Sequence, residues 1–173
     1  ELQMMAEGGD ISGLSGIVDG VSGDKVENPA GGLLAPGMSV DITDFSTMDD
    51  NTVLSVVSML LPTNDAFVGL DNWEIPTEAG TYTMLLNAYD AGTEANDEII
   101  NGAGAPGAAG IPFDPAGMNG TGGSGVTMEE ATQMVHIHRG NLGDDDAAGG
   151  KSDLNNTVHR WLNPVVKITV TVK

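Results

Sequence analysis

Apolar and polar residues alternate along several stretches of the chain, as they do in strands with one buried face. Met38–Phe45 reads MSVDITDF and Val165–Val172 reads VVKITVTV, so apolar side chains recur at every second position. We expect Met38–Phe45 to be a half-buried strand and Val165–Val172 to be the last strand. Thr52–Leu61, TVLSVVSMLL, is almost continuously apolar and β-branched, which predicts a central strand covered on both faces.

Shorter apolar runs between turn residues predict the remaining elements. Thr81–Ala88, TYTMLLNA, and Thr132–His138, TQMVHIH, are expected to be strands, and Ala66–Leu70, AFVGL, is either a short strand or a turn back. Near the start, Glu1–Glu7 is predicted to form one short helix that ends at the Gly8-Gly9 pair.

Three segments carry loop composition. Residues 20–37 are broken by Gly and Pro, residues 101–125 have Gly or Pro at almost every second or third position, and Gly140–Asn156 is acidic. The chain of 173 residues shows no internal repeat and no change of composition, so we expect one domain over residues 1–173. Strands joined by such variable loops predict an all-β antiparallel sandwich, with the loops gathered at its two ends.

The charge of the chain narrows its possible partners. There are 25 Asp and Glu against 6 Lys and Arg, a net charge of −19. This excludes nucleic-acid binding and docking on anionic lipid, because both need a basic surface. It favours cation binding, high-salt surroundings or solubility.

The chain contains no cysteine, which excludes thiol catalysis, a zinc–thiolate site and a disulfide scaffold. No apolar run is long enough to insert into a membrane. The start has neither the basic nor the apolar region of a signal peptide, so we expect a mature form whose leader has been removed.

Two acidic stretches flank predicted strands. LPTNDAFVGLD contains Asp65 and Asp71, and YDAGTEANDE contains Asp90, Glu94, Asp97 and Glu98. Calcium prefers about six to eight oxygen ligands, such as carboxylates and backbone carbonyls. Neither stretch has the EF-hand pattern, so a site would have to be assembled from two or three loops. The alternative is that these acids form a solvated surface.

Four motifs in one order resemble a known family. They are SMLLPTNDAFVGLD (residues 58–71), AYDAGTEANDE (88–98), VHIHRGNLGD (135–144) and NPVVKITV (163–170). Together they resemble the spondin N-terminal domain family in its bacterial form, whose animal members are the F-spondin and mindin domains. The resemblance extends from about Leu2 to the C-terminus. It implies a C2-like β-sandwich, secreted or extracellular, that holds a calcium ion in loops at one end.

The resemblance directs attention to particular acids. The family's P-x-x-D-x-F-V-G turn matches at Asp65, and its Y-D-A-G-T-[DE] turn matches at Asp90 and Glu94. These three carboxylates are therefore expected to bind Ca²⁺, with backbone carbonyls and Asn64 completing the shell. The remaining candidate ligands are Asp97, Glu98 and Asp71.

The chain departs from the family in two ways. The family's opening strand has no counterpart ahead of the segment ELQMMAEGGDISGL, and the histidine pair of VHIHRG is absent from the animal domains. A sheet that lacks a strand leaves unpaired backbone groups, which a strand from another copy of the chain can fill. Alternatively, residues 1–37 fill the gap within the same chain.

His136 and His138 are two positions apart, so on a strand they point to the same face. With His159 as a third ligand they would suit zinc or copper. The alternative is that the two histidines, helped by Arg139, form hydrogen bonds with the acidic loops.

The sequence favours a secreted, extracellular or periplasmic calcium-binding module for adhesion, without enzymatic activity, whose partner is the extracellular matrix or a surface glycan. The alternative is a structural subunit of a filament or tube, with copies of itself as partners. A carbohydrate-active enzyme is a third interpretation. No Ser lies in the strand–turn–helix context of a nucleophile elbow, and aromatic residues for stacking sugars are few.

Overall fold

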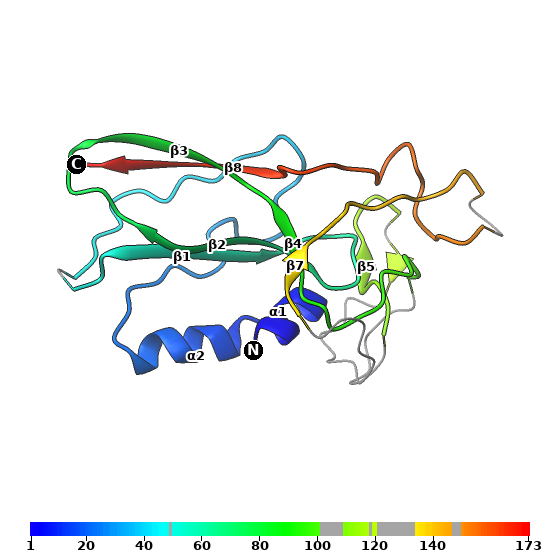
Figure 1. The fold of residues 1–173 in the computed structure, drawn as a ribbon, viewed down its shortest axis with the longest axis horizontal. Helices are drawn as coiled ribbons and strands as arrows, with labels where there is room; N and C mark the ends of the chain where they lie inside the picture. The colour runs from blue at the N-terminus through cyan, green and yellow to red at the C-terminus, as the bar shows by residue number, and fades with distance from the viewer. Residues whose placement is uncertain (49, 101–108, 118, 121–133, 147–149) are drawn as a thin grey trace.

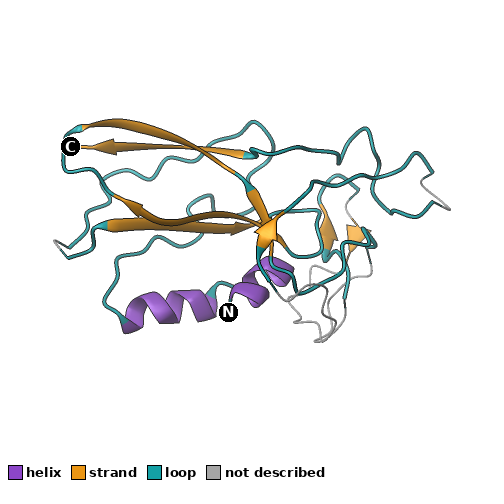
Figure 2. Ribbon diagram, in the orientation of Figure 1, coloured by secondary structure: helices purple, strands orange, loops and turns teal. Residues whose placement is uncertain are grey.

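The chain folds mainly into antiparallel strands, with two short helices at its N-terminal end (Figure 2). The computed structural model describes the chain except residues 49, 101–108, 118, 121–133 and 147–149. In chain order the elements are α1 (Leu2–Gly8), α2 (Ser12–Gly20), β1 (Val53–Met59), β2 (Ala66–Glu74), β3 (Gly80–Leu86), β4 (Ala88–Asp90), β5 (Phe113–Asp114), β6 (Asn119–Gly120), β7 (His136–Ile137) and β8 (Val166–Val172). The predicted all-β fold class is thereby confirmed.

Two antiparallel sheets carry most of these strands within the described part of the chain. The larger has the order β1-β2-β4-β7, and the smaller pairs β3 with β8 from Gly80↔Val172 to Leu86↔Val166. β5 and β6 form a separate small hairpin. Because β4 pairs with β2 at Ala66↔Asp90, the turn before β2 and the turn after β4 lie at the same end of the sheet.

The two sheets run along one another, and the helices lie on the opposite side of the larger sheet (Figure 1). The rings of Trp73 on β2 and Tyr82 on β3 meet with their centroids 6.1 Å apart. Helix α1 contacts both β1 and β2. No helix among the described residues is long and apolar enough to cross a membrane.

A small core lies where α1 meets the end of the larger sheet. Its buried residues are Met5, Ala6, Phe67 and Ala91, and the ring of Tyr89 stacks on Phe67 with centroids 5.8 Å apart. Gly9 caps the end of helix α1, and its φ of 73° gives the left-handed conformation that glycine favours. The predicted helix and its glycine end are thus confirmed. Ala91 belongs to the acidic turn after β4, so the core supports that turn from below.

Met38–Phe45 was predicted to be a strand, and this prediction is wrong. The segment belongs to no sheet, and the exposed fractions of Met38 and Ile42 are 66% and 51%. A strand needs a neighbour to receive its backbone hydrogen bonds, and alternation in one segment says nothing about that neighbour. Near the end of the segment, Asp44 Oδ1 lies 3.2 Å from Nζ of Lys173, the residue that follows β8.

The central position predicted for Thr52–Leu61 is also wrong. β1 covers Val53–Met59 and is an edge strand of the larger sheet, with Val53 and Val57 exposed. Apolar composition indicates a strand but not its place in the sheet. The strand itself was therefore predicted correctly, and its position in the sheet was not.

Other boundaries differ from those expected. β2 extends to Glu74 instead of ending at Leu70, and the run Thr81–Ala88 divides at Asn87 into β3 and β4. Helix α2 was not predicted, since glycines interrupt its sequence.

The C-terminal half agrees with the sequence in part. The last strand is confirmed as β8. Of the predicted strand Thr132–His138, residues 132 and 133 lie outside the described part, and only His136–Ile137 form a strand. Much of the loop 101–125 also lies outside it. Gly140–Asn156 holds one isolated bridge, Asp144↔Asn155, among its described residues.

Candidate functional site

The turn between β1 and β2 points an aspartate into the protein. A cis peptide bond joins Leu61 to Pro62, and the Thr63 hydroxyl accepts a hydrogen bond from the Ala66 amide at 3.2 Å. Asp65, between them, is fully buried. This turn therefore presents a carboxylate to the interior at the end of the larger sheet.

The Asp65 carboxylate joins this turn to the acidic turn after β4. Its Oδ2 accepts hydrogen bonds from the Thr93 amide at 2.8 Å, the Thr93 hydroxyl at 3.1 Å and the Glu94 amide at 3.0 Å. Its Oδ1 is buried and has no hydrogen-bond partner in the described structure. One oxygen of this carboxylate thus organises the loop, and the other is available for a ligand.

Asp90 accepts hydrogen bonds from within its own turn, the acidic turn after β4. Its Oδ1 accepts a hydrogen bond from the Gly92 amide at 2.7 Å, and Gly92 has a φ of 75°, a left-handed conformation that favours glycine. Its Oδ2 accepts a bond from Asn96 Nδ2 at 2.5 Å. Asp90 is 2% exposed, so a second carboxylate lies buried beside Asp65.

Glu94 is the third buried carboxylate, at 1% exposure. Its Oε2 accepts hydrogen bonds from the Gly110 amide at 2.9 Å and from Asn64 Nδ2 at 3.3 Å. Its Oε1 is buried without a partner in the described chain, as is Oδ1 of Asp65. Buried polar atoms are nearly always hydrogen-bonded, so two orphaned carboxylate oxygens in one site need an explanation.

The surroundings of these carboxylates oppose their ionisation. Burial raises the pKa of Asp65, and the neighbouring Asp90 adds to this, whereas the Thr93 and Glu94 amides act in the opposite direction. Burial, together with the carboxylates of Glu7 and Asp65, raises the pKa of Glu94 to about 7. A cation at this site would reverse both effects, because an opposite charge favours the ionised form.

Glu7, at the end of helix α1, is a fourth buried acid that the sequence analysis missed. It is 1% exposed, and its Oε1 accepts a hydrogen bond from Gln3 Nε2 at 2.7 Å. In the sequence, only the spacing of Gln3 and Glu7, four residues apart, indicates that they lie on the same face of the helix.

The other predicted ligands lie elsewhere or have other roles. Asp71 is exposed on β2, away from the turns. Asp97 is exposed and accepts hydrogen bonds from Asn64 Nδ2 and the Ile99 amide, both at 3.0 Å. Asn64 itself uses Oδ1 to accept a bond from the Glu98 amide at 3.3 Å. The turns therefore bring together Asp65, Asp90 and Glu94, and they leave Asp71 apart.

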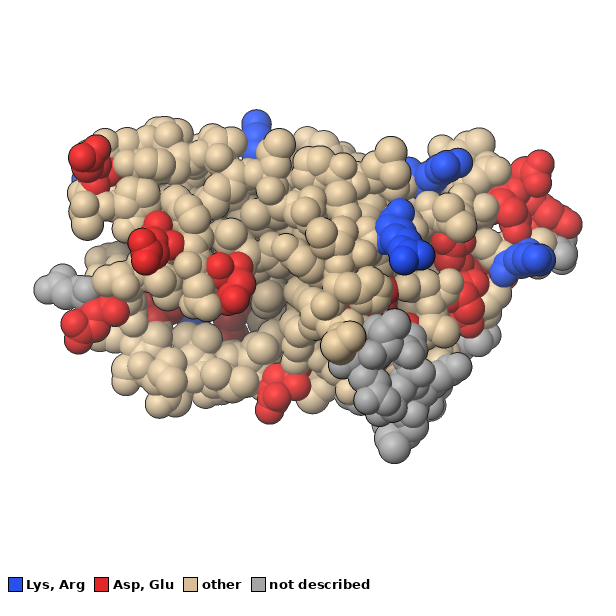
Figure 3. Space-filling model, in the orientation of Figure 1, with Lys and Arg blue, Asp and Glu red and all other residues tan. Residues whose placement is uncertain are grey.

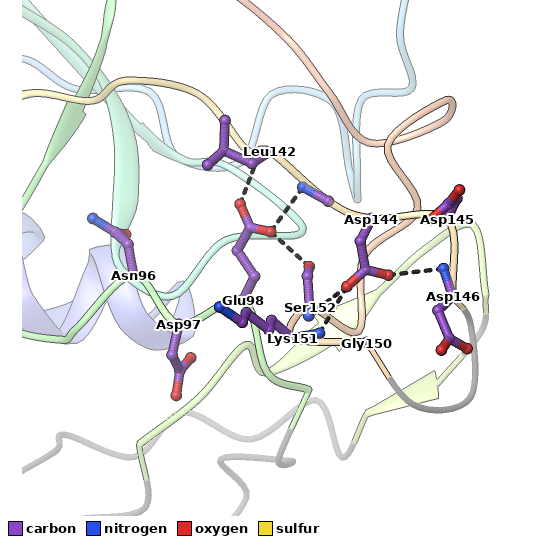
Figure 4. Close-up of a pocket in the computed structure, with 11 residues that line it drawn as sticks. Asn96, Asp97, Glu98, Leu142, Asp144, Asp145, Asp146, Gly150, Lys151 and Ser152 are labelled. Atoms are coloured by element: carbon purple, nitrogen blue, oxygen red, sulfur yellow. Dashed lines mark hydrogen bonds between the residues drawn. The ribbon is translucent and has the colours of Figure 1, made fainter.

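Glu98 holds the acidic loop Gly140–Asn156 against the domain (Figure 4). It accepts hydrogen bonds from the Leu142 and Gly143 amides at 2.6 and 2.8 Å and from the Ser152 hydroxyl at 2.6 Å. Asp144 similarly accepts bonds from the amides of Lys151 and Ser152. These residues line an open pocket of about 530 Å³, from which the Asp97 carboxylate points away.

The two histidines of VHIHRG face the acidic turn. His136 Nε2 lies 3.6 Å from Asp90 Oδ2. His138 accepts the Gly140 amide at Nδ1, so its Nε2 carries the proton and donates to Asn96 Oδ1 at 3.2 Å. Burial lowers the pKa of His138, whose ring stacks on Trp161 with centroids 5.1 Å apart.

His159 was considered as a third metal ligand with His136 and His138, but its contacts are with other residues. Its Nε2 lies 3.2 Å from Asp114 Oδ1, and its Nδ1 accepts the Asn155 amide at 2.9 Å. His138 thus makes the hydrogen bond to the acidic turn that the alternative expects, through Asn96. His136 only lies near Asp90, and its Nδ1 is 3.1 Å from the Met134 carbonyl oxygen. His159 is paired with Asp114 on β5.

Charged side chains are unevenly spread over the surface. In Figure 3, most of the visible Lys and Arg and a group of Asp and Glu lie at the end that carries the acidic loops, and separate Asp and Glu lie over the opposite half. Within the described residues, no three His, Asp or Glu side chains are arranged to hold a metal ion between them alone.

Comparisons with protein-family models, with curated proteins and with solved structures found no match for this chain.

Proposed function

We propose that this protein is a calcium-stabilised binding module without enzymatic activity, which acts in adhesion outside the cytoplasm. The observation that carries the proposal is the pair of buried, unpartnered oxygens, Asp65 Oδ1 and Glu94 Oε1. Two desolvated carboxylates with free oxygens, next to Asp90, are costly without a counter-charge. A calcium ion supplies that charge and accepts carboxylate oxygens as ligands.

The coordination shell would combine several kinds of oxygen. Asp65 and Glu94 supply their free oxygens, Asp90 adds a third carboxylate, and backbone carbonyls and Asn64 complete the shell. Asp97 is a neighbour that could join it. The turns must adjust on binding, because the side chains alone do not form a finished cage among the described residues.

The resemblance to the spondin N-terminal family supports the same proposal. The family's two loop motifs match at Asp65, Asp90 and Glu94, and all three are buried at the same end of the larger sheet. We also propose that the two antiparallel sheets form a C2-like sandwich, supported by the ring contact between Trp73 and Tyr82. A matrix component or a surface glycan is the proposed partner.

Thermal melting with calcium or with EGTA tests this function. A ligand that binds only the folded state, at about a hundredfold excess over Kd, stabilises it by about 2.7 kcal/mol. We expect calcium to raise the Tm of the wild type by roughly 5 to 11 °C. An identical Tm in calcium and in EGTA would refute the proposal.

Asp65→Asn is the sharpest variant, since an amide oxygen can keep the three bonds that Oδ2 accepts. The amide nitrogen then takes the place of the free Oδ1. The variant should fold and lose most of the calcium-dependent shift. Asp71→Asn is the matched control, because Asp71 is exposed on β2, and it should keep the whole shift.

A second candidate, a subunit of an extracellular filament or tube, is favoured by one observation. Residues 33–48 place seven exposed apolar side chains along a segment outside every sheet: Leu33, Leu34, Met38, Val40, Ile42, Phe45 and Met48. The outer edges of β3 and β8 have no ladder partner among the described residues. An exposed sheet edge and an apolar segment outside every sheet are complementary, so copies could join by adding a strand, with calcium between acidic loops such as Asp144–Asp146.

Sedimentation in millimolar calcium separates the two candidates. A subunit should form larger species as concentration rises, and Ile42→Ser should reduce them, whereas Asp41→Ser on the same segment should not. A single monomeric species over a wide range of concentration would rule out the subunit.

A further inference from the structure

Helix α1 packs directly on the acidic turn. Met5 and Ala6 are buried together with Phe67 and Ala91, and Ala91 lies between Asp90 and Gly92 in the chain. Leu2 packs at the rim of the same cluster. The position of this helix and the shape of the turn are therefore coupled through shared packing.

The same helix brings Glu7 into the buried acidic site. Glu7 is 1% exposed and is oriented by the bond from Gln3 Nε2 at 2.7 Å. After burial, its carboxylate is the largest influence that raises the pKa of Glu94. With α1 in place, Asp65, Asp90, Glu94 and Glu7 are all buried at one end of the domain.

We propose that Glu7 is a further cation-facing carboxylate of this site, and that cation binding fastens helix α1 to the domain. This inference rests on the proposed calcium function and adds a residue and a conformational consequence to it. Helix α1 has only 7 residues, too few for a helix to be stable on its own in water. Its stability must come from its packing and from the charge balance around Glu7.

Two opposing effects act on the helix. Burial of Met5 and Ala6 stabilises the docked helix. Burial of the Glu7 carboxylate beside Glu94 destabilises it when no cation is present. A cation removes the second effect and leaves the first. The coupling is reciprocal, so a helix that docks more firmly with calcium must also increase calcium affinity. In its absence α1 opens and uncovers the apolar surface of Phe67 and Ala91.

Hydrogen exchange of the full chain measures docking of α1 without any substitution. The Met5 and Gly9 amides donate to Glu1 O at 3.1 Å and to Met5 O at 2.9 Å, so they report whether the helix is formed. We expect their exchange to slow on the order of tenfold when calcium replaces EGTA.

Glu7→Gln then tests the role of the carboxylate. By calorimetric titration with calcium, the variant should bind on the order of tenfold more weakly. In EGTA, its α1 amides should be better protected than those of the wild type, since the repulsion from Glu94 is gone. Glu1→Gln, at the exposed start of the same helix, is the matched control and should change neither quantity.

The outcomes separate this inference from the function on which it rests. If the wild type binds calcium, but exchange of α1 is equal in calcium and EGTA and Glu7→Gln binds normally, the fastening of α1 is wrong and the calcium function stands. If the wild type binds no calcium, both are wrong. Weaker binding by Glu7→Gln together with calcium-dependent protection of α1 would support the inference.

Discussion

Replacing Glu94 by Gln should stabilise the calcium-free protein at neutral and alkaline pH. The glutamine carbonyl can accept the bonds that Gly110 and Asn64 now donate to Oε2. Its amide nitrogen takes the position of Oε1, which has no partner within the described residues. The substitution therefore removes one buried negative charge and breaks no hydrogen bond.

The size of the effect follows from the pKa of Glu94, which burial and the neighbouring acids raise from 4.5 to about 7. A carboxyl group whose folded pKa lies above its unfolded pKa opposes folding when it is ionised. The penalty is absent at a pH below the unfolded pKa, grows through the window from 4.5 to about 7, and is complete above it. At a cost of about 1.4 kcal/mol per pKa unit, the full penalty is about 3 kcal/mol.

Melting curves in EGTA between about pH 5 and pH 8 provide the assay. The wild type should lose stability as the pH rises, and at about pH 8 the variant should melt roughly 6 to 12 °C above it. In the variant, the raised pKa of Asp65 still contributes a loss of stability with rising pH, whereas the lowered pKa of His138 contributes a gain. Glu74→Gln, an exposed site on β2, is the control. Equal melting temperatures of wild type and Glu94→Gln at about pH 8 would show that Glu94 is not a destabilising buried charge.

Three other substitutions test separate parts of the structure. Glu98→Ala removes the acceptor for three hydrogen bonds from the loop 142–152, so urea unfolding should show a loss of about 2 kcal/mol and proteolysis should cut this loop first; normal stability and an uncut loop would contradict its anchoring role. Gly140→Ala should lower the Tm by several degrees, because the glycine has a φ of 87° and an added Cβ would lie 2.3 Å from the Trp161 carbonyl oxygen. Gly16→Ala, in helix α2 with open space around it, should instead stabilise by about 0.5–1 kcal/mol, and a loss of stability there would argue against the helix.

Strand and helix identity could be predicted where the local pattern was strong. Val165–Val172 and the helix before Gly8-Gly9 formed as expected, because alternation and glycine caps act within a few residues. Met38–Phe45 has an equally good alternation but forms no strand, and the apolar β1 lies at an edge. Pairing partners are distant in the chain, so a local pattern cannot specify them.

The candidate site shows the same division. The types and spacing of Asp65, Asp90 and Glu94 are properties of the sequence, and together with the family resemblance they were sufficient to single out these three acids. Only the tertiary structure decided that they are buried together, that Asp65 Oδ1 and Glu94 Oε1 have no partner among the described residues, and that Asp71 lies apart. Only the packing of α1 on Ala91 brought Glu7 to the site. Burial and electrostatic coupling depend on neighbours from several segments of the chain, and these neighbours meet only when the chain has folded.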